Sequence, residues 1–247
     1  MTHTAIFAHR GVSSQYPENT MIAFQAAADL GIEGIELDVQ LSKERVPVVI
    51  HDLTVNRTTN GKGFIKDYTV AELKELSAGG KFAQSYDQEE IPTLAEVLEF
   101  AHTNDLLLNI ELKGYIWERQ EMLDSVLPLL EESRLGKRLI ISSFDHKGLR
   151  LLRERSPEIE TALLVTGALD RPELYVKQAG AQGYHYHTPL MLKEEAQQVM
   201  HAGIELRPYT VNDKEWLRRY MEWSISGVIT DYPQVALEIR RQLENNG

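Results

Sequence analysis

The chain contains 247 residues, of which 43% are hydrophobic and 26% charged, a balance typical of a protein that buries its own core. The absence of cysteine excludes disulfide bonds and thiolate metal sites, and it fits a reducing compartment. A formal net charge of −11 argues against nonspecific binding to nucleic acid or to an anionic membrane, because both attract basic surfaces.

Short β-type runs alternate with amphipathic stretches along the whole chain. The predicted strands are residues 4–8, 34–39, 106–111, 138–142, 160–165, 182–186, 204–209 and 227–230. Apolar residues at helical spacing lie between them, for example at 21–30, 93–102, 119–131 and 193–202. This repetition predicts a parallel sheet, and eight parallel strands close a barrel. We therefore predict an α/β fold, a (β/α)8 TIM barrel formed as one domain by residues 1–247.

Two segments depart from the alternation. The β-type run at 46–50 follows the strand at 34–39 after only a few polar residues, whereas a parallel crossover needs a dozen or more. We predict an antiparallel hairpin arm after the second strand, with its turn near Glu44 and with Asp38 opposite His51. Residues 52–91 include a short helical piece at 70–76 and are too long for a barrel loop, so we predict a small insertion.

Acidic residues lie where functional residues of such barrels gather, at the C-terminal ends of the strands. Glu36 and Asp38 are two positions apart, so their side chains share the face that points into the barrel, and Glu111 lies near the end of the next parallel strand. Carboxylates pointing inward repel each other unless a cation lies between them. The set predicts one divalent cation, Mg²⁺ or Ca²⁺, although each acid has an alternative role in a structural salt bridge.

Two histidines and two cations flank this cluster in the predicted barrel. His9 and His51 are candidates for a general acid and a general base, since imidazole exchanges protons near neutral pH. Arg10 and Lys113 are candidates for binding phosphate oxygens. Each histidine could instead have a structural role, and the two cations could instead form salt bridges to the same carboxylates.

Later strand ends supply candidates for the walls of a pocket. Phe144, Tyr115 and Tyr209 are predicted to form its apolar side, and His187 to line it, although aromatic residues at strand ends also serve in packing. His185 shares a face with His187, as in barrels that bind transition metals through two histidines, but the later strand ends lack matching ligands. We expect Asp231 to cap or pair, and Asn19 or Thr20 to cap the helix that follows.

The ordered motifs resemble the glycerophosphodiester phosphodiesterase family. They are His9-Arg10-Gly11, Pro17-Glu18-Asn19-Thr20, Glu36-Leu37-Asp38-Val39, His51-Asp52 and Glu111-Leu112-Lys113, followed by Ser143-Phe144, Tyr-Thr-Val-Asn at 209–212 and Gly-Val-Ile-Thr-Asp at 227–231. The resemblance extends from residue 9 to about residue 231 and includes the insertion. One departure is Tyr209, where members often carry Trp.

The resemblance implies hydrolysis of glycerophosphodiesters to sn-glycerol 3-phosphate and an alcohol. In the implied mechanism, Glu36, Asp38 and Glu111 bind the metal and a glycerol 2-hydroxyl attacks phosphorus to give a cyclic phosphate, which water then opens. His9 and His51 exchange the protons, while Arg10 and Lys113 contact the phosphate.

Several alternatives and partners remain open at this point. A lysophospholipase D-like or glycerophosphoinositol-cleaving enzyme would share the barrel, and so would a catalytically silent protein that binds polyol phosphates. We expect a small-molecule substrate, no nucleic-acid partner and a cytoplasmic location, because the sequence contains neither a signal peptide nor a run of 18 apolar residues that could span a membrane. A homodimer is possible, and the preferred alcohol is not determined.

Overall fold

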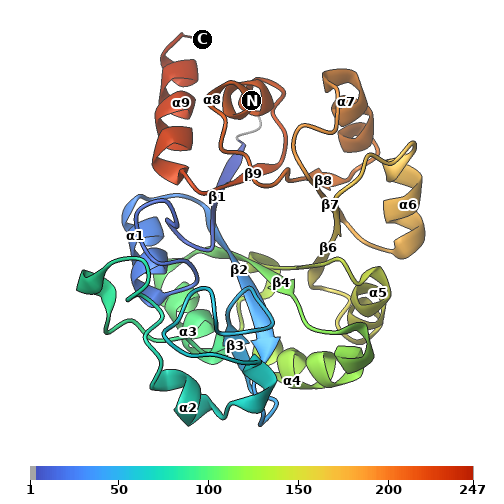
Figure 1. Ribbon diagram of the computed structural model, residues 1–247. Coiled ribbons are helices and arrows are strands. Elements are labelled where there is room, and N and C mark those ends of the chain that lie inside the picture. Colours follow the sequence, from blue (N-terminus) through green and yellow to red (C-terminus); the bar gives the residue numbers. More distant parts are fainter. Residues whose placement is uncertain (1–3, 247) are drawn as a thin grey trace.

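A computed structural model of the chain, describing residues 4–246, shows a ring of parallel strands surrounded by helices (Figure 1). The barrel strands are β1 (Ala5–His9), β2 (Gly34–Leu41), β4 (Leu107–Leu112), β5 (Leu139–Ser143), β6 (Glu160–Val165), β7 (Gly183–Tyr186), β8 (Glu205–Leu206) and β9 (Gly227–Thr230). The helices are α1 (Met21–Asp29), α2 (Val70–Lys74), α3 (Leu94–Asn104), α4 (Arg119–Glu132), α5 (His146–Arg155), α6 (Pro172–Ala179), α7 (Lys193–His201), α8 (Lys214–Glu222) and α9 (Pro233–Asn246). Among these, none is long and apolar enough to cross a membrane.

The eight barrel strands pair in parallel in the order β8-β7-β6-β5-β4-β2-β1-β9, which confirms the predicted fold class. Hydrogen bonds from the segment after β8 bring the two ends of the sheet together, with Val211 N donating to Ile229 O at 2.8 Å and Ile229 N donating to Pro208 O at 3.1 Å. The predicted strand at 204–209 is regular only over Glu205–Leu206, although hydrogen bonds to β7 continue beyond it, from Arg207 N to Tyr184 O at 3.2 Å and from Tyr209 N to Tyr186 O at 2.9 Å. The barrel is therefore nearly closed, and its strand ends converge on one site.

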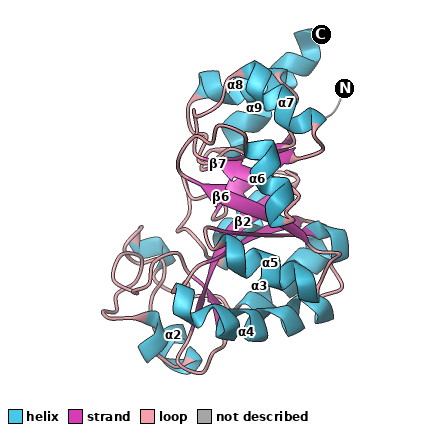
Figure 2. Cartoon of the chain, turned by 90° about the vertical axis from the view of Figure 1, so that its right-hand side faces the viewer, coloured by secondary structure: helices cyan, strands magenta, loops and turns pink. Residues whose placement is uncertain are grey.

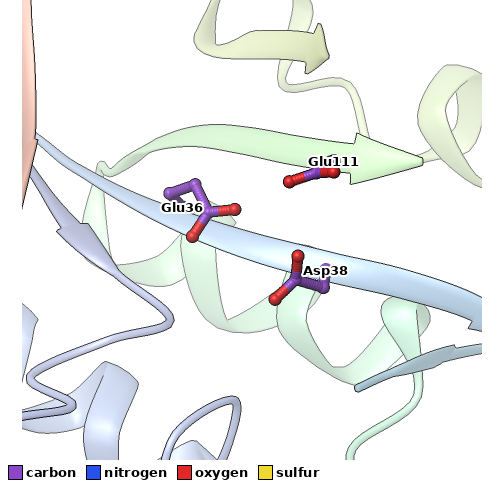
Figure 3. Close-up of side chains that lie close together, drawn as sticks. All are labelled: Glu36, Asp38 and Glu111. Carbon is purple, nitrogen blue, oxygen red and sulfur yellow. The ribbon is translucent and has the colours of Figure 1, made fainter. Parts of the chain in front are cut away.

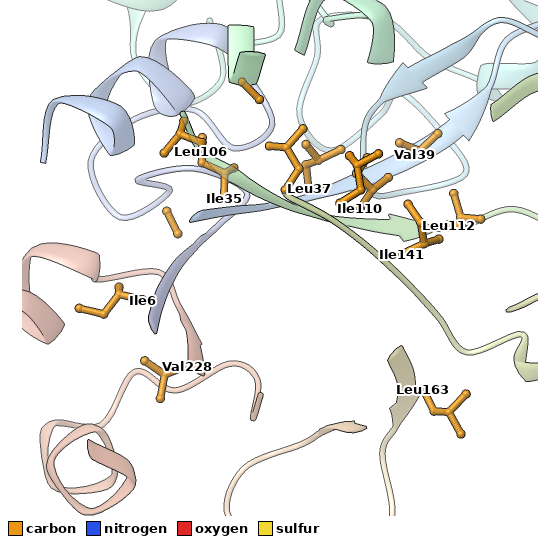
Figure 4. Packing of buried hydrophobic residues seen from close by; sticks show 14 of the residues in the cluster. Ile6, Ile35, Leu37, Val39, Leu106, Ile110, Leu112, Ile141, Leu163 and Val228 are labelled. Carbon is orange, nitrogen blue, oxygen red and sulfur yellow. The ribbon is translucent and has the colours of Figure 1, made fainter. Parts of the chain in front are cut away.

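Alternation along β2 separates the core from the barrel interior. Ile35, Leu37 and Val39 are fully buried on the outer side of the strand, toward the helices (Figure 4). Glu36 and Asp38 take the positions between them and point inward. Thr20 precedes helix α1 as its N-cap and its hydroxyl accepts from Ala23 N, so the predicted cap is confirmed for Thr20.

Replacing Leu37 with alanine is expected to lower the free energy of unfolding by about 2–5 kcal/mol, because the cavity left in a close-packed core cannot collapse completely. Chemical denaturation of both proteins measures this difference. Leu174 on α6 is 49% exposed, and its replacement by alanine should change the stability by no more than about 0.5 kcal/mol. Equal losses for the two variants would contradict the placement of Leu37 in the core.

The hairpin arm after β2 forms as predicted, but its register differs by one residue. Strand β3 (Pro47–Val49) pairs antiparallel with β2, and Val39 lies opposite Val49. Ser42 N donates to Val46 O across the turn, so the hairpin is symmetric about Glu44 and Asp38 lies opposite Ile50. The prediction that Asp38 faces His51 was wrong, and His51 follows the end of the arm.

Residues 52–91 lie to one side of the barrel strands (Figure 2). They contain α2 and two short 3₁₀ turns, η1 (Ile65–Asp67) and η2 (Gln84–Tyr86). Their apolar side chains form a small cluster of their own with the arm, consisting of Val48, Ile50, Val55, Ile65, Leu73, Ala78 and Ile91. This packing fixes the segment that begins at His51 against the mouth of the barrel.

Candidate active site

Three carboxylates meet inside the barrel. Glu36 and Asp38 extend from β2 and Glu111 extends from β4, where Asp38 and Glu111 are register partners (Figure 3). Their exposed fractions are 3%, 0% and 8%, and one oxygen of each lies within 4.8 Å of the others. We call Glu36, Asp38 and Glu111 the acidic trio.

Two cations approach the acidic trio from neighbouring strand ends. Arg10 Nε lies 3.1 Å from Asp38 Oδ2, and Lys113 Nζ lies 3.2 Å from Asp38 Oδ1 and 2.5 Å from Glu111 Oε1. The backbone N–H of Arg10 also donates to Glu36 Oε2 at 3.1 Å. Both cations therefore form the salt bridges to the carboxylates that the sequence offered as the alternative to phosphate binding.

The acidic trio holds more negative charge than these contacts balance. Burial opposes the charged form of Asp38, but Arg10 and Lys113 offset it, so the pKa of Asp38 is lowered. Burial, together with the charges of Asp38 and Glu111, raises the pKa of Glu36 well above its usual value. Burial and the charge of Asp38 likewise raise the pKa of Glu111 to about 7. A divalent cation would relieve this repulsion.

The donor set also fits a hard cation. Among residues 4–246, the ammonium of Lys113 is the group that contacts Asp38 Oδ1 and Glu111 Oε1, at 3.2 Å and 2.5 Å, and neither oxygen has a further hydrogen-bond partner. Carboxylate oxygens are the ligands that Mg²⁺ and Ca²⁺ prefer. The trio can therefore bind a metal ion.

His9 is held by a carboxylate from the opposite end of the chain. Its Nδ1 lies 2.6 Å from Asp231 Oδ1, and its Nε2 lies 3.8 Å from Glu36 Oε2. Asn212 Nδ2 donates to the other oxygen of Asp231 at 2.6 Å, and Ser13 Oγ donates to Oδ1 at 3.1 Å. Asp231 thus pairs, as expected, and it fixes the imidazole so that Nε2 faces the acidic trio.

His51 has a similar arrangement on the other side. Its Nδ1 lies 2.7 Å from Asp52 Oδ1, and Arg57 Nε donates to Asp52 Oδ2 at 2.8 Å. Arg57 also donates to Glu18, which accepts from Arg10 Nη1 at 2.8 Å. The hydrogen bonds from Arg57, together with the bond to His51, outweigh the opposing effect of burial and lower the pKa of Asp52 to about 2.

The protonation of His51 follows from its surroundings. Burial lowers its pKa, and this effect exceeds the opposing attraction of the Asp38 charge. His51 is consequently neutral near pH 7 and can accept a proton. Sequence reasoning identified both histidines but missed Asp52, Arg57 and Glu18 as the network that orients this one.

The predicted wall residues Phe144, Tyr209 and His187 form one row. The Tyr209 ring meets Phe144 edge-on at 6.4 Å between centroids and His187 edge-on at 5.9 Å. Tyr209 Oη donates to Val165 O at 2.8 Å, which fixes the ring. The row borders the strand ends from β5 to β8.

His185 has a different environment. It is completely buried, and its Nε2 lies 3.5 Å from Arg207 Nη1. Burial and the charge of Arg207 lower the pKa of His185 well below its usual value. We assign it to the packing of the barrel interior rather than to the site.

Comparisons with known proteins agree on one kind of enzyme. Residues 9–235 match the model of the glycerophosphoryl diester phosphodiesterase family. A glycerophosphodiester phosphodiesterase of Bacillus altitudinis is 39% identical over 98% of this chain and 100% of its own length. One of Caldanaerobacter subterraneus is 40% identical over 97% of this chain and 98% of its own. The structure of an Oleispira antarctica phosphodiesterase in complex with the product sn-glycerol-3-phosphate superposes with a TM-score of 0.90, at 31% identity and 96% coverage of both chains.

Proposed function

Because the chain belongs to the glycerophosphoryl diester phosphodiesterase family and is a phosphoric diester hydrolase, we propose that it cleaves glycerophosphodiesters in a metal-dependent reaction with two histidines as acid and base. The products would be sn-glycerol 3-phosphate and an alcohol. The observation that carries this proposal is the acidic trio, buried between two histidines whose Nδ1 atoms are each held by an aspartate.

Glu36, Asp38 and Glu111 would hold one divalent cation, Mg²⁺ or Ca²⁺, since all three offer buried carboxylate oxygens. When bound, such an ion neutralises the negative charge of the trio and polarises a phosphate oxygen. The remaining chemistry belongs to side chains around it.

Arg10 and Lys113 would bind the phosphate. Both lie within 3.2 Å of Asp38 oxygens, at the point where a phosphate group would share their positive charge. Arg10 offers a planar fork of donors and Lys113 a point charge, so together they can hold two phosphate oxygens. The aromatic row of Phe144, Tyr209 and His187 would form a wall of the pocket beside it.

His9 and His51 would transfer protons. The 2-hydroxyl of the glycerol attacks phosphorus, the P–O bond to the alcohol breaks, and a cyclic phosphate forms. One histidine takes the hydroxyl proton on Nε2 while the other gives a proton to the leaving alcohol. Water then opens the ring with the two roles reversed, and both histidines return to their initial state.

The test is release of sn-glycerol 3-phosphate from glycerophosphocholine and glycerophosphoethanolamine, first in EDTA and then with Mg²⁺ or Ca²⁺ restored. We expect release only with the metal. Release that continues undiminished in EDTA would contradict the metal dependence. Absence of release from both substrates, with either metal and a folded protein, would favour the catalytically silent barrel.

Asp231 supplies a second prediction, because it acts on the reaction through His9. Replacing it with asparagine keeps the shape of the side chain but removes the charge that holds Nδ1–H, so the imidazole can adopt the wrong tautomer. We expect kcat to fall by roughly 10- to 10⁴-fold, the upper end being the loss known for the corresponding change in a serine-protease triad. The Michaelis constant should change little, since Asp231 does not touch the phosphate.

The measurement is kcat and KM with glycerophosphocholine across pH 5–9. Asp213→Asn is a matched control, because Asp213 caps α8 through Glu215 N and Trp216 N and belongs to no contact of His9. An unchanged pH profile with normal kcat for Asp231→Asn would show that the pair with His9 is only structural.

A further inference from the structure

A cavity of about 620 Å³ opens directly beside the acidic trio. Glu111, Lys113 and His51 form part of its wall, so it is continuous with the place where the phosphate would react. Its volume is within the roughly 300–1,000 Å³ of sites that bury drug-sized molecules. Glycerol with a small alcohol such as choline would fill only part of it.

The cavity has an apolar floor and an apolar mouth. Met122 and Leu123 of α4 and Leu149 of α5 lie at its floor and are almost completely buried. Phe64 and Ile116 at the mouth are 44% and 67% exposed. Exposed apolar side chains are normally scattered singly on a surface, whereas these two line the same cavity. Phe64 comes from the insertion and Ile116 from the segment after β4, so the two sides of the mouth have separate origins in the chain.

The acidic side chains in the cavity wall already have cationic partners. Arg119 Nη2 donates to Asp145 Oδ1 at 2.6 Å, and Arg57 holds Asp52. Glu118 lies 3.9 Å from Arg45 Nη1. A positively charged headgroup would have to compete with each of these arginines for a carboxylate, so charge does not favour such an occupant.

The aromatic ring of Tyr115 at the mouth is engaged as well. Lys66 Nζ lies 5.4 Å from its centroid, and Trp117 stacks on it with 4.4 Å between centroids. Lys66 also lies 5.9 Å from the centroid of Phe64. Because the Lys66 ammonium already lies over these rings, a quaternary ammonium would have to displace it to gain the same cation–π attraction.

We propose that this cavity binds a hydrocarbon chain of the substrate, so that the enzyme favours glycerophosphodiesters that carry one acyl or alkyl chain. With the phosphate at Arg10 and Lys113, the chain passes Glu111, runs over the floor formed by Met122 and Leu149, and ends between the apolar side chains of the mouth. This inference rests on the proposed function, because it requires the phosphate to bind beside the acidic trio.

The test compares kcat/KM for glycerophosphocholine with that for lysophosphatidylcholines of butanoyl to decanoyl length, each below its micelle concentration. Burial of one methylene group contributes about 0.8 kcal/mol, so kcat/KM should rise by up to roughly fourfold per methylene until the cavity is filled. Glycerophospho-octanol carries its chain on the leaving alcohol, whereas the lysophosphatidylcholines carry it on the glycerol. Comparing the two shows which half of the diester binds in the cavity. The proposal would be overturned if kcat/KM stays flat or falls with acyl-chain length and glycerophospho-octanol also has no advantage over glycerophosphocholine.

Variants at the mouth separate the cavity from general hydrophobicity. Phe64→Asn and Ile116→Asn should each reduce the advantage of the octanoyl substrate by at least about fivefold, because the chain end then meets a polar surface. Turnover of glycerophosphocholine should stay within about twofold, because neither residue touches the phosphate site. Leu174→Asn is the matched control, since Leu174 is 49% exposed but lies outside the cavity wall, and it should change neither value.

Binding measured without turnover distinguishes this inference from the proposed function. Calorimetry with butyl to decyl phosphate gives affinities that do not depend on hydrolysis. If glycerophosphocholine is cleaved but neither kcat/KM nor affinity depends on chain length, the inference fails and the proposed function stands. If no diester is cleaved while affinity increases with chain length, the proposed function fails and the apolar cavity is supported. Affinities independent of chain length would overturn the inference in either case.

Discussion

Replacement of His51 by alanine is expected to lower kcat for glycerophosphocholine by at least roughly 10²–10⁴-fold, the usual contribution of general acid–base catalysis. His51 has its Nδ1 bound to Asp52 and lies at the entrance of the barrel, beside the acidic trio. Its lowered pKa keeps it neutral near pH 7, so it can take a proton without first losing one. Alanine removes this acceptor and leaves the carboxylates and phosphate-binding cations in place.

The measurement is kcat at saturating substrate and metal, with circular dichroism and thermal unfolding to show that the fold is retained. His9→Ala should cause a comparable loss. The double variant should lose much less than the product of the two single losses, because the histidines act as a unit. His201→Ala, on the exposed face of α7, controls for loss of an imidazole and should leave kcat unchanged. Near-normal turnover by His51→Ala would contradict the assignment.

The acidic trio was predictable because it depends on local periodicity. Side chains alternate along a strand with a period of two, so the apolar neighbours Ile35 and Leu37 determine where Glu36 and Asp38 point. Glu111 alternates with apolar neighbours in the same way, and the parallel register of β2 and β4 places it beside Asp38. The barrel was predictable for a similar reason, since each strand and helix has its own pattern of apolar residues.

The pairing of Asp231 with His9 and that of Arg57 with Glu18 were not predictable because they depend on how distant segments meet. His9 and Asp231 are 222 positions apart, and they meet because β1 pairs with β9, with Ala8 opposite Thr230. Arg57 and Glu18 meet through the conformations of two loops. No spacing in the sequence encodes either contact.

The register of the hairpin arm was ambiguous for another reason. Residues 47–50 are buried on both sides, against the barrel and against the insertion, and their sequence Pro-Val-Val-Ile contains no polar alternation. A strand with two buried faces does not distinguish one register from the next by its apolar pattern. Phe144 and Tyr115 of the predicted pocket line the cavity, but Phe64 and Ile116 at its mouth were not predicted because they are separated in the sequence.

Replacement of Glu36 by glutamine is expected to change stability in opposite directions with and without metal. Burial and the charges of Asp38 and Glu111 raise the pKa of Glu36 well above its usual value, so its charged form destabilises the metal-free fold. In EDTA near pH 8, the neutral amide should stabilise the protein by about 1 kcal/mol or more. This corresponds to a rise in Tm of roughly 2–4 °C for a chain of this length. The gain should shrink toward pH 4, where Glu36 is largely protonated in both the folded and unfolded states.

With a divalent cation the order should reverse. Wild-type protein gains stability from any ion that binds only the folded state, in proportion to the logarithm of the affinity. Loss of one of three carboxylates should reduce that affinity by at least roughly tenfold, the lower end of the loss caused by replacing even an outer-shell partner of a metal ligand. The rise in Tm on adding Mg²⁺ or Ca²⁺ should therefore be large for the wild type and small for Glu36→Gln. Glu154→Gln, an exposed change on α5, should behave like the wild type in both conditions.

These two Tm measurements distinguish a cation site from a set of salt bridges without any assay of activity. If Arg10 and Lys113 were the intended partners of the trio, removing the Glu36 charge would cost stability in EDTA, and metal would affect wild type and variant equally. If the variant is more stable than the wild type without metal and less stabilised by metal, the trio is a cation site. Repulsion among buried carboxylates destabilises the metal-free fold, and only a bound cation offsets it. Loss of stability in EDTA, together with an unchanged response to metal, would show that the acidic trio is structural.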